Sequence, residues 1–482
     1  MATLSSPGIG SGLDVKTIVP QLVAIERQPI DLLNAKNTDL QAQLSAFGLL
    51  SSYTDNIHDA IARLANPTFW QQTSSSSSDS SSVVASSTSD ASVGNYSVEV
   101  SQLAQSQSLA SKAYTDSTAS VGTGTLHIAF GSWSADGTKF TEATPPSQVD
   151  IPVPLGENSL DAVKAKINAA NAGLSASIVK DATGTRLVIR STDTGVEHSV
   201  RITADADAPI TTDGPTLNDL VYDPENTKPP KMEQTSAAQN AKATLNGLAI
   251  ESSSNTFSDV SDGLSITVAK VTTSPVTLKV GMDTASMKSA VNDFVNAYNA
   301  FNKYIADQTK YDPDKKVAAT LQGDRSTLSL QSQLRAMLQA SNRGASSVYT
   351  NLSDVGIETQ PDGSLKVNDA KLSAAMSNNM PELAKAFTAQ DTLHPANSGF
   401  AVRFEALTQA LNDSDGVIAT RSQGLRSSID RNNKQVDVLE DRVAAYQDRL
   451  LKQYSALDAT MNSLNNLNAY VTQQITNWNK SK

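Results

Sequence analysis

The sequence has 482 residues, no cysteine, a net charge of -11 at pH 7 and only 5% aromatic residues. A chain of this length holds two to four domains, and the lack of cysteine excludes disulfides and cysteine-ligated metal sites. The acidic balance argues against nucleic acid as a partner, and we expect neither membrane insertion nor a cleaved signal peptide, because no apolar run approaches ~18 residues and the N-terminus lacks a basic and an apolar region.

The first 66 residues are predicted to be helical after a flexible start. Residues 1–12 are rich in Gly, Ser and Pro, and their glycines lack the spacing of a phosphate-binding loop. Asp14 is a suitable N-cap for a first helix. Pro20 should kink that helix, and Pro29 should lie in the first turn of a second helix that ends at Asn66. The apolar positions of the first helix are Val15, Ile18, Leu22 and Ile25.

The middle of the chain predicts β-structure. Residues 73–82, TSSSSSDSSS, have low complexity and predict a linker. From Val83 apolar and polar residues alternate, as they do in half-buried strands. Asn246-Gly247 is a strong signal for a two-residue hairpin turn. Residues 83–283 are therefore predicted to form a β-rich head.

Helical periodicity returns at Thr284. Further helices are predicted at about 326–341, 369–377, 381–388 and 399–412. These helices, together with the end of the second N-terminal helix, are expected to form a bundle.

The stretch Leu425–Trp478 contains neither Gly nor Pro and repeats apolar residues every 3.5 positions, which predicts a coiled coil. Glu440 and Arg442 fall at its flanking positions, where interhelical ion pairs form. Beyond Gln453 only Asp458 is charged before Lys480, so the outer face there is cheap to desolvate. The seam is interrupted by Asn432, Gln453, Thr460 and Gln474. Its apolar positions are Leu425, Ile429, Val436, Leu439, Val443, Tyr446, Leu450, Leu457, Leu464, Leu467, Val471 and Trp478.

Together these patterns predict an α+β multidomain fold in which the two helical ends pair antiparallel and the β-rich head is inserted between them. The expected parts are a terminal coiled coil (1–45 and 425–482), a helical-bundle body (46–72 and 284–424), a Ser-rich linker (73–82), one head subdomain (83–112 and 241–283) and a second, inserted head subdomain (113–240).

No catalytic, cofactor or metal site is predicted. The four histidines lack metal-ligand spacing, and no GxSxG, HExxH or P-loop motif occurs. Asp312-Pro313-Asp314 begins like a calcium loop, but the twelfth position of such a loop is Gly323 instead of Glu. We therefore predict a protein that is not an enzyme and needs no cofactor.

Several stretches resemble the family of bacterial flagellar filament cap proteins (hook-associated protein 2, FliD). They cover nearly the whole chain in order, and Pro20 and the Ser tract depart from the family pattern. The stretches are SPGIGSGLDVKTIVPQLVAIERQPI (6–30), INAANAGLSASIVKDATGTRLVIRS (167–191, which also resembles a flagellin repeat), AQNAKATLNGLAIESSSNTFSDVSDGLSITV (238–268), FVNAYNAFNKYI (294–305), LQGDRSTLSLQSQLRAML (321–338), SDVGIETQPDGSLKVNDAKL (353–372) and LDATMNSLNNLNAYVTQQI (457–475).

The resemblance implies a non-enzymatic structural protein that caps the distal end of the flagellar filament as a homo-oligomer, usually a homopentamer. It implies that the protein promotes folding and insertion of exported flagellin, and that it serves motility. Implied partners are flagellin, the hook–filament junction proteins and a type III export chaperone that binds the C-terminal coil. The implied location is extracellular, at the filament tip, after export by the flagellar type III system. In some members the head also acts in adhesion to mucin or host cells.

On this reading the apolar positions near both chain ends make coiled-coil, oligomer and filament contacts. They are Ile18, Leu22, Ile25, Leu439, Val443, Tyr446, Leu450, Leu457, Leu464, Leu467, Val471, Ile475 and Trp478. An ordinary intramolecular coiled coil is the alternative for the C-terminal stretch. For the whole chain, the alternatives are a surface adhesin that presents the head on a stalk and a secreted hydrolase.

Overall fold

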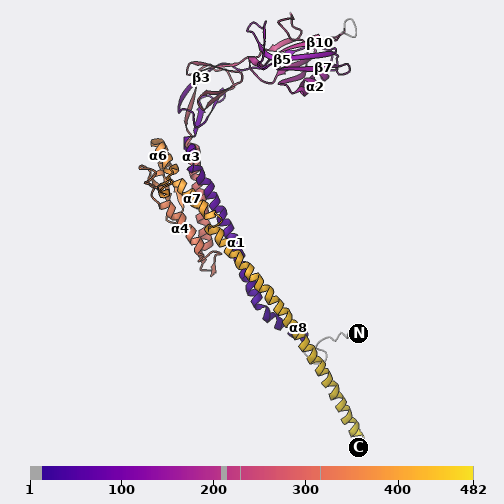
Figure 1. Cartoon of the computed structure of the whole chain (residues 1–482), viewed down its shortest axis with the longest axis vertical. Coiled ribbons are helices and arrows are strands. Elements are labelled where there is room, and N and C mark those ends of the chain that lie inside the picture. The colour runs from indigo at the N-terminus through magenta and orange to yellow at the C-terminus, as the bar shows by residue number, and fades with distance from the viewer. Residues whose placement is uncertain (1–13, 208–213, 228, 315, 481–482) are drawn as a thin grey trace. The chain divides into compact units, whose positions relative to one another are not determined.

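The computed structural model describes residues 14–480 except 208–213, 228 and 315. It divides into two compact units (Figure 1): unit 1 contains Met1–Trp70 and Thr284–Lys482, and unit 2 contains Gln71–Asp283. The flexibility expected for residues 1–12 lies outside the described residues. The predicted α+β class, with helical ends and a β-rich segment between them, is confirmed.

Unit 1 is helical. The α-helices of its described residues are α1 (Val15–Ala65), α3 (Thr284–Thr309), α4 (Arg325–Gln339), α5 (Asp369–Asn378), α6 (Met380–Thr388), α7 (Phe400–Asn412) and α8 (Val417–Lys480). Short 3₁₀ helices lie at Leu352–Val355 and Pro395–Asn397, and two small hairpins are formed by β17 (Tyr311–Asp312) with β18 (Val317–Ala318) and by β19 (Ile357–Thr359) with β20 (Leu365–Val367). The four short helices predicted between 326 and 412 are confirmed to within two residues.

One continuous helix, α1, replaces the two helices expected from the N-terminal sequence. Asp14 caps it as predicted, since its carboxylate accepts from the backbone N–H of Thr17 at 3.3 Å. The break expected at Pro29 was therefore wrong, whereas the kink expected at Pro20 stays a prediction. Both prolines lie on the exposed side of α1, and packing of the opposite side against α8 outweighs the backbone hydrogen bond that each proline removes.

The second half of α1 packs into the helical bundle. The bundle core contains aromatic pairs: Trp70 stacks on Phe387 with 4.9 Å between ring centroids, and Phe294 meets Phe404 edge-on at 5.2 Å. The α1 side chains buried with them are Phe47, Leu50, Ile57, Ile61 and Leu64. Because α8 also enters this bundle at its start, the bundle holds one end of the α1–α8 pair.

The first part of unit 2 consists of two antiparallel sheets that share one hydrophobic core. The five-stranded sheet has the order β1 (Thr73–Ser77), β16 (Val276–Met282), β3 (Gly94–Gln102), β12 (Ala241–Leu245) and β13 (Leu248–Ser252). The three-stranded sheet has the order β14 (Thr256–Ser261), β15 (Leu264–Val268) and β2 (Val83–Ser87). The hairpin predicted at Asn246-Gly247 is confirmed, with both residues at positive φ (50° and 81°) between β12 and β13.

The second part of unit 2 is formed by the chain between β3 and β12. One sheet has the order β10 (Ser199–Ala206), β5 (Gly124–Trp133) and β6 (Phe140–Glu142), with β7 (Gln148–Val153) also paired to β5. The other has the order β11 (Glu233–Ser236), β4 (Ser108–Ala110), β9 (Gly184–Ser191) and β8 (Leu174–Asp181). Helix α2 (Leu160–Ala170) covers their common core.

The Ser tract at 73–82 is not a linker. Its first half is strand β1, paired antiparallel with β16 from Thr73 opposite Met282 to Ser77 opposite Leu278, and Asp79 caps the turn that leads into β2. The hydroxyl of Thr73 donates to the carbonyl of Thr88 at 2.7 Å. Serine carries no apolar alternation, so the tract looks unstructured in sequence, whereas its backbone and hydroxyl groups are satisfied by neighbouring strands.

Candidate assembly surface

The first half of α1 and the matching part of α8 pack along each other as a two-helix stalk, which we define as residues 15–44 of α1 and 425–454 of α8 (Figure 1). Its described core consists of buried Val15, Val19, Val23 and Ile30 from α1 with Val443 and Leu450 from α8. The half-buried residues around them are Leu22, Val436, Leu439, Tyr446 and Tyr454. The seam predicted for α8 from its heptads is therefore the face that meets α1.

Two ion pairs cross the stalk at the predicted flanking positions. Arg442 Nη2 lies 2.7 Å from Glu26 Oε1, and Arg27 Nη2 lies 3.4 Å from Glu440 Oε1. These groups remain largely solvated, so each pair contributes less than about 1 kcal/mol to stability. Their value is orientational, because they align α1 antiparallel to α8.

An asparagine cluster interrupts the apolar seam where Asn432 was recognised as a gap. Asn37 donates to Asn433 Oδ1 at 2.7 Å and accepts from Asn432 at 2.9 Å. Asn37 was not predicted from the sequence, although a single polar residue within the apolar ladder of α1 is a signal that could have identified it.

The thirteen sequence-predicted positions fall into two groups. Those packed in the stalk core or against it are Leu22, Leu439, Val443, Tyr446 and Leu450. Those outside that core are Ile18, Ile25, Leu457, Leu464, Leu467, Val471, Ile475 and Trp478. Ile18 is half-buried and Ile25 is 60% exposed. The last six positions lie on α8 beyond the start of α1 and are 42–71% exposed.

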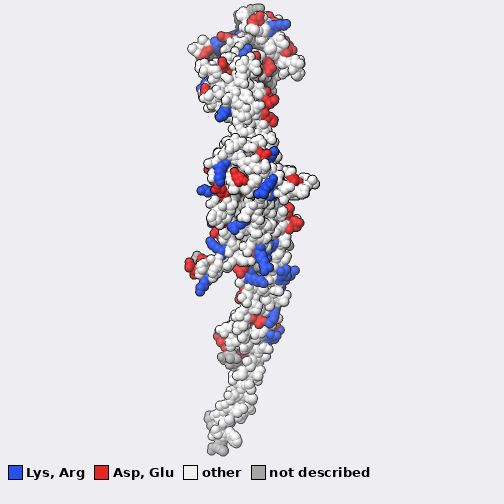
Figure 2. All heavy atoms as spheres, turned by 90° about the vertical axis from the view of Figure 1, so that its left-hand side faces the viewer, with Lys and Arg blue, Asp and Glu red and all other residues white. Residues whose placement is uncertain are grey.

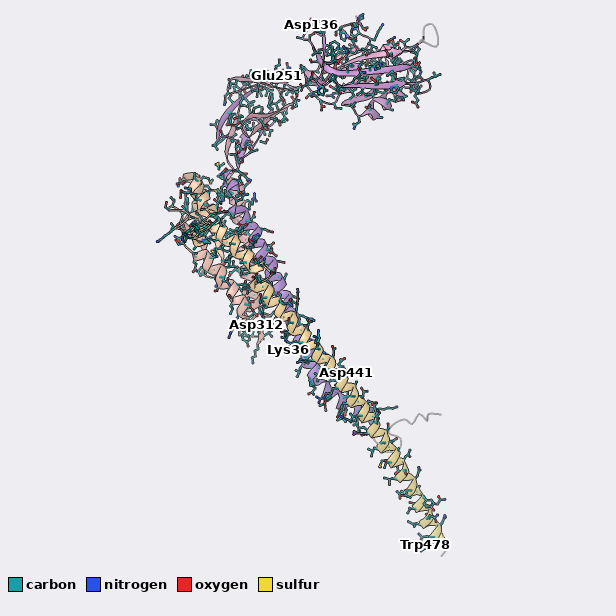
Figure 3. All side chains as sticks on the ribbon, in the orientation of Figure 1. Lys36, Asp136, Glu251, Asp312, Asp441 and Trp478 are labelled. Atoms are coloured by element: carbon teal, nitrogen blue, oxygen red, sulfur yellow. The ribbon has the colours of Figure 1, made fainter. Side chains whose placement is uncertain are left out.

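Residues 457–478 of α8, here called the tail, continue the heptad seam without α1 opposite them. Figure 3 labels Trp478 at the end of the tail, and Lys36 and Asp441 on the stalk. From Gln453 to Asn479 the only charged residue is Asp458, and the matching end of the space-filling view is almost free of charge colour (Figure 2). An exposed apolar seam framed by neutral amides suits burial against another helix, since few charges need desolvation.

A second apolar ladder runs along α1 beside the buried one. Its members follow the 4-3-4-3 spacing of a heptad repeat and are Ile18, Leu22, Ile25, Pro29 and Leu32; of these, Leu22 also packs against the stalk core. Between Thr17 and Ile30 the only charged residues are Glu26 and Arg27, and both pair with α8. Helix α1 is thus apolar on two sides, which is the property of a helix that packs against more than one neighbour.

The described residues contain no group of three or more His, Asp or Glu that could hold a metal ion. His127 lies between Asp150 and Asp205, at 2.7 and 3.3 Å, on three neighbouring strands, and the hydrogen bond with Asp150 raises its pKa. None of the helices in the described part of the chain combines the length and apolar character that a membrane crossing needs.

Comparison with known proteins gives matches along the chain. Residues 11–107 match the family model for the N-terminus of flagellar hook-associated protein 2, residues 238–466 match that for its C-terminus, and residues 134–193 match the flagellin hook IN motif. The flagellar hook-associated protein 2 of Escherichia coli K12 is 30% identical over all of both chains, and the B-type protein of Pseudomonas aeruginosa is 30% identical over 98% of this chain and 97% of its own. The crystal structure of the D1-D2-D3 domains of the flagellar cap protein FliD from Escherichia coli superposes with a TM-score of 0.61 at 29% identity, over 79% of this chain and 99% of that chain.

Proposed function

The chain belongs to the family of flagellar hook-associated protein 2, the flagellar filament cap, and from this premise we propose that it oligomerises at the distal end of a filament and promotes folding and insertion of exported flagellin. The family is one of structural cap proteins, which fits a protein without enzymatic activity. Its place is the filament tip. We propose that it reaches this place through the flagellar type III export system, without a cleaved signal peptide, and acts there as a homopentamer.

The observation that carries the proposal is the tail. Six of its apolar side chains are 42–71% exposed along a seam that has no α1 beside it, and the surrounding residues are almost all neutral. Helices from flagellin or from a neighbouring copy would bury this seam at the filament end. We propose that an export chaperone covers the same seam before export, and that hook–filament junction proteins support the cap before the filament grows.

Substitution in the tail tests the proposal while keeping its length. In the first variant Leu464, Val471 and Ile475 are each replaced by Ser; in the control Asn462, Asn466 and Gln473, which are exposed on the same helix, are replaced by Ser. In motile cells we expect short or absent filaments and unpolymerised flagellin in the medium for the first variant, and normal filaments for the control. Normal filaments in both strains would refute the capping role and leave the adhesin alternative, which needs the head but not the tail.

A further inference from the structure

The asparagine cluster is the only polar interruption in the described stalk seam whose side chains bond each other across the two helices. Asn37 and Asn432 are each only 7% exposed; the Asn432 side-chain amide donates to the Asn37 carbonyl, and the Asn37 amide in turn donates to Asn433. In a helix pair, such a buried polar layer contributes little to stability and much to the choice of pairing.

We propose that Asn37, Asn432 and Asn433 specify the register in which α1 and α8 pair in the stalk. The apolar ladders alone do not specify it, because both repeat every seven residues. Moving α8 by one heptad would bring Val443 into the place of Val436 and Leu450 into the place of Val443, so that most apolar contacts would be replaced by equivalent ones.

The ion pairs discriminate poorly as well. In a shift of one heptad, Arg449 takes the place that Arg442 holds opposite Glu26, so a basic residue still faces that carboxylate. Arg27 would then face Gln447 instead of Glu440, but the lost pair is solvated and contributes less than about 1 kcal/mol. The asparagines are different. The same shift places Leu439 at the level of Asn37 and Glu440 at the place of Asn433. The N–H of Asn37 then keeps an acceptor, but its carbonyl loses the Asn432 donor, and Asn432 is buried away from Asn37 without its partner.

The consequence concerns the length of the tail. A heptad shift moves α8 by roughly 10 Å along α1, and the exposed seam beyond the start of α1 grows or shrinks by that amount. If the chain caps a filament as proposed above, the asparagine layer would therefore fix how far Trp478 extends beyond the stalk. The pairing itself can be measured on the purified full-length chain and does not depend on the capping role.

Cross-linking tests the proposal cleanly because the chain contains no cysteine of its own. The R27C/E440C pair reports the native register, since the two native side chains approach to 3.4 Å. The R27C/Q447C pair reports a shift of one heptad. With a short bis-maleimide we expect the native layer to give the first cross-link and almost none of the second.

After Asn37→Leu with Asn432→Leu, we expect the second cross-link to increase roughly tenfold, the factor that one unpaired buried amide supplies. The matched control is Asn34→Leu with Gln435→Leu, two exposed positions on the same helices, which should keep the native pattern. Mixing chains that carry R27C alone with chains that carry E440C alone shows whether any of the cross-link forms between chains instead of within one.

An unchanged cross-linking pattern in the layer variant would overturn the proposal and assign the register to the helical bundle that holds one end of the stalk. Equal changes in the layer variant and the control would also overturn it, because the cause would then be added apolar surface. If the double leucine variant aggregates, Asn37→Ala is scored in the same way, since it leaves Asn432 without its partner at a smaller volume.

Discussion

Replacing a leucine of α8 by alanine should mainly destabilise the isolated chain when the leucine lies in the stalk core, and should mainly impair the assembled filament when it lies in the tail. Leu450 is 8% exposed in the stalk core, whereas Leu464 is 52% exposed in the tail. Truncating a buried leucine to alanine costs about 2–5 kcal/mol. We take the lower end, about 2 kcal/mol, because a two-helix seam encloses a side chain less completely than a globular core. For Leu464→Ala the expected change in the isolated chain is within about 0.5 kcal/mol.

Hydrogen exchange followed by mass spectrometry measures these changes locally, which matters because a chain of two units does not unfold in one step. A loss of about 2 kcal/mol corresponds to roughly 30-fold faster exchange through local opening. We expect this acceleration in residues 15–30 and 439–454 for Leu450→Ala. For Leu464→Ala we expect a change of less than roughly threefold.

In cells the order should reverse: Leu464→Ala should weaken capping and release flagellin more than its effect on the isolated chain suggests. Equal acceleration of stalk exchange by the two substitutions would refute the reasoning, because it would mean that the tail is already packed in the isolated chain. Strong protection of residues 457–478 at high dilution would refute it in the same way, since a helix of this length that has no second helix packed along it is only marginally stable.

Two further predictions concern unit 2 and the bundle. The hydrogen bond with Asp150, reinforced by Asp205, raises the pKa of His127 in the folded protein, so protonated His127 stabilises unit 2 fully below the unfolded pKa of about 6.5 and this stabilisation is lost as pH rises through the folded value. His127→Gln should therefore lower the melting temperature of unit 2 more at pH 5.5 than at pH 8.5, and an equal decrease at both pH values would contradict this. Gly247→Ala should destabilise the β12–β13 hairpin by about 1 kcal/mol, because an added Cβ meets no neighbouring atom but φ at this position is 81°. Gly48→Ala, where an added Cβ also meets no atom, should stabilise helix α1 by up to about 1 kcal/mol. Chemical denaturation measures both changes in unfolding free energy, and a change of the same sign for both would contradict the backbone argument.

The seam of α8 could be predicted from sequence because one pattern dominates it. From Leu425 to Trp478 nothing breaks the helix, and a single apolar ladder recurs at heptad spacing. That pattern also located Glu440 and Arg442, and both form the expected interhelical ion pairs. A long, uninterrupted repeat constrains which face is buried far more tightly than a short one does.

The seam of α1 could not be predicted in the same way, because two ladders compete on one helix. Val15, Ile18, Leu22 and Ile25 are as periodic as the set that the structure buries, which is Val15, Val19, Val23 and Ile30. Sequence spacing cannot decide which of two apolar sides faces α8. The asparagines could have decided it: aligning the gap at Asn432 with Asn37 selects the ladder that contains Ile30.

The Ser tract was mispredicted for a different reason. Strand β1 is held by its backbone pairing with β16 and by hydroxyl contacts to the chain that follows, and these partners lie up to some two hundred residues away in sequence. A run of serines has no apolar alternation of its own, so local pattern carries no information about such pairing. Its strand character is a tertiary effect.

The two helices of the stalk differ in their proline content, and the difference follows from what packs beside each helix. Within the described stalk α1 has α8 beside it, so packing can offset the hydrogen bonds lost at Pro20 and Pro29. Helix α8 continues beyond the start of α1, and there its own backbone bonds and helix propensity have a larger share in keeping the seam in one line. The absence of Gly and Pro from Leu425 to Trp478 is therefore what an extended tail needs, because a proline among residues 457–478 would remove a hydrogen bond where α1 offers no packing to compensate for it. In the stalk and tail, prolines are thus placed in the helix that has α8 along its side, and they are missing where α8 extends past α1.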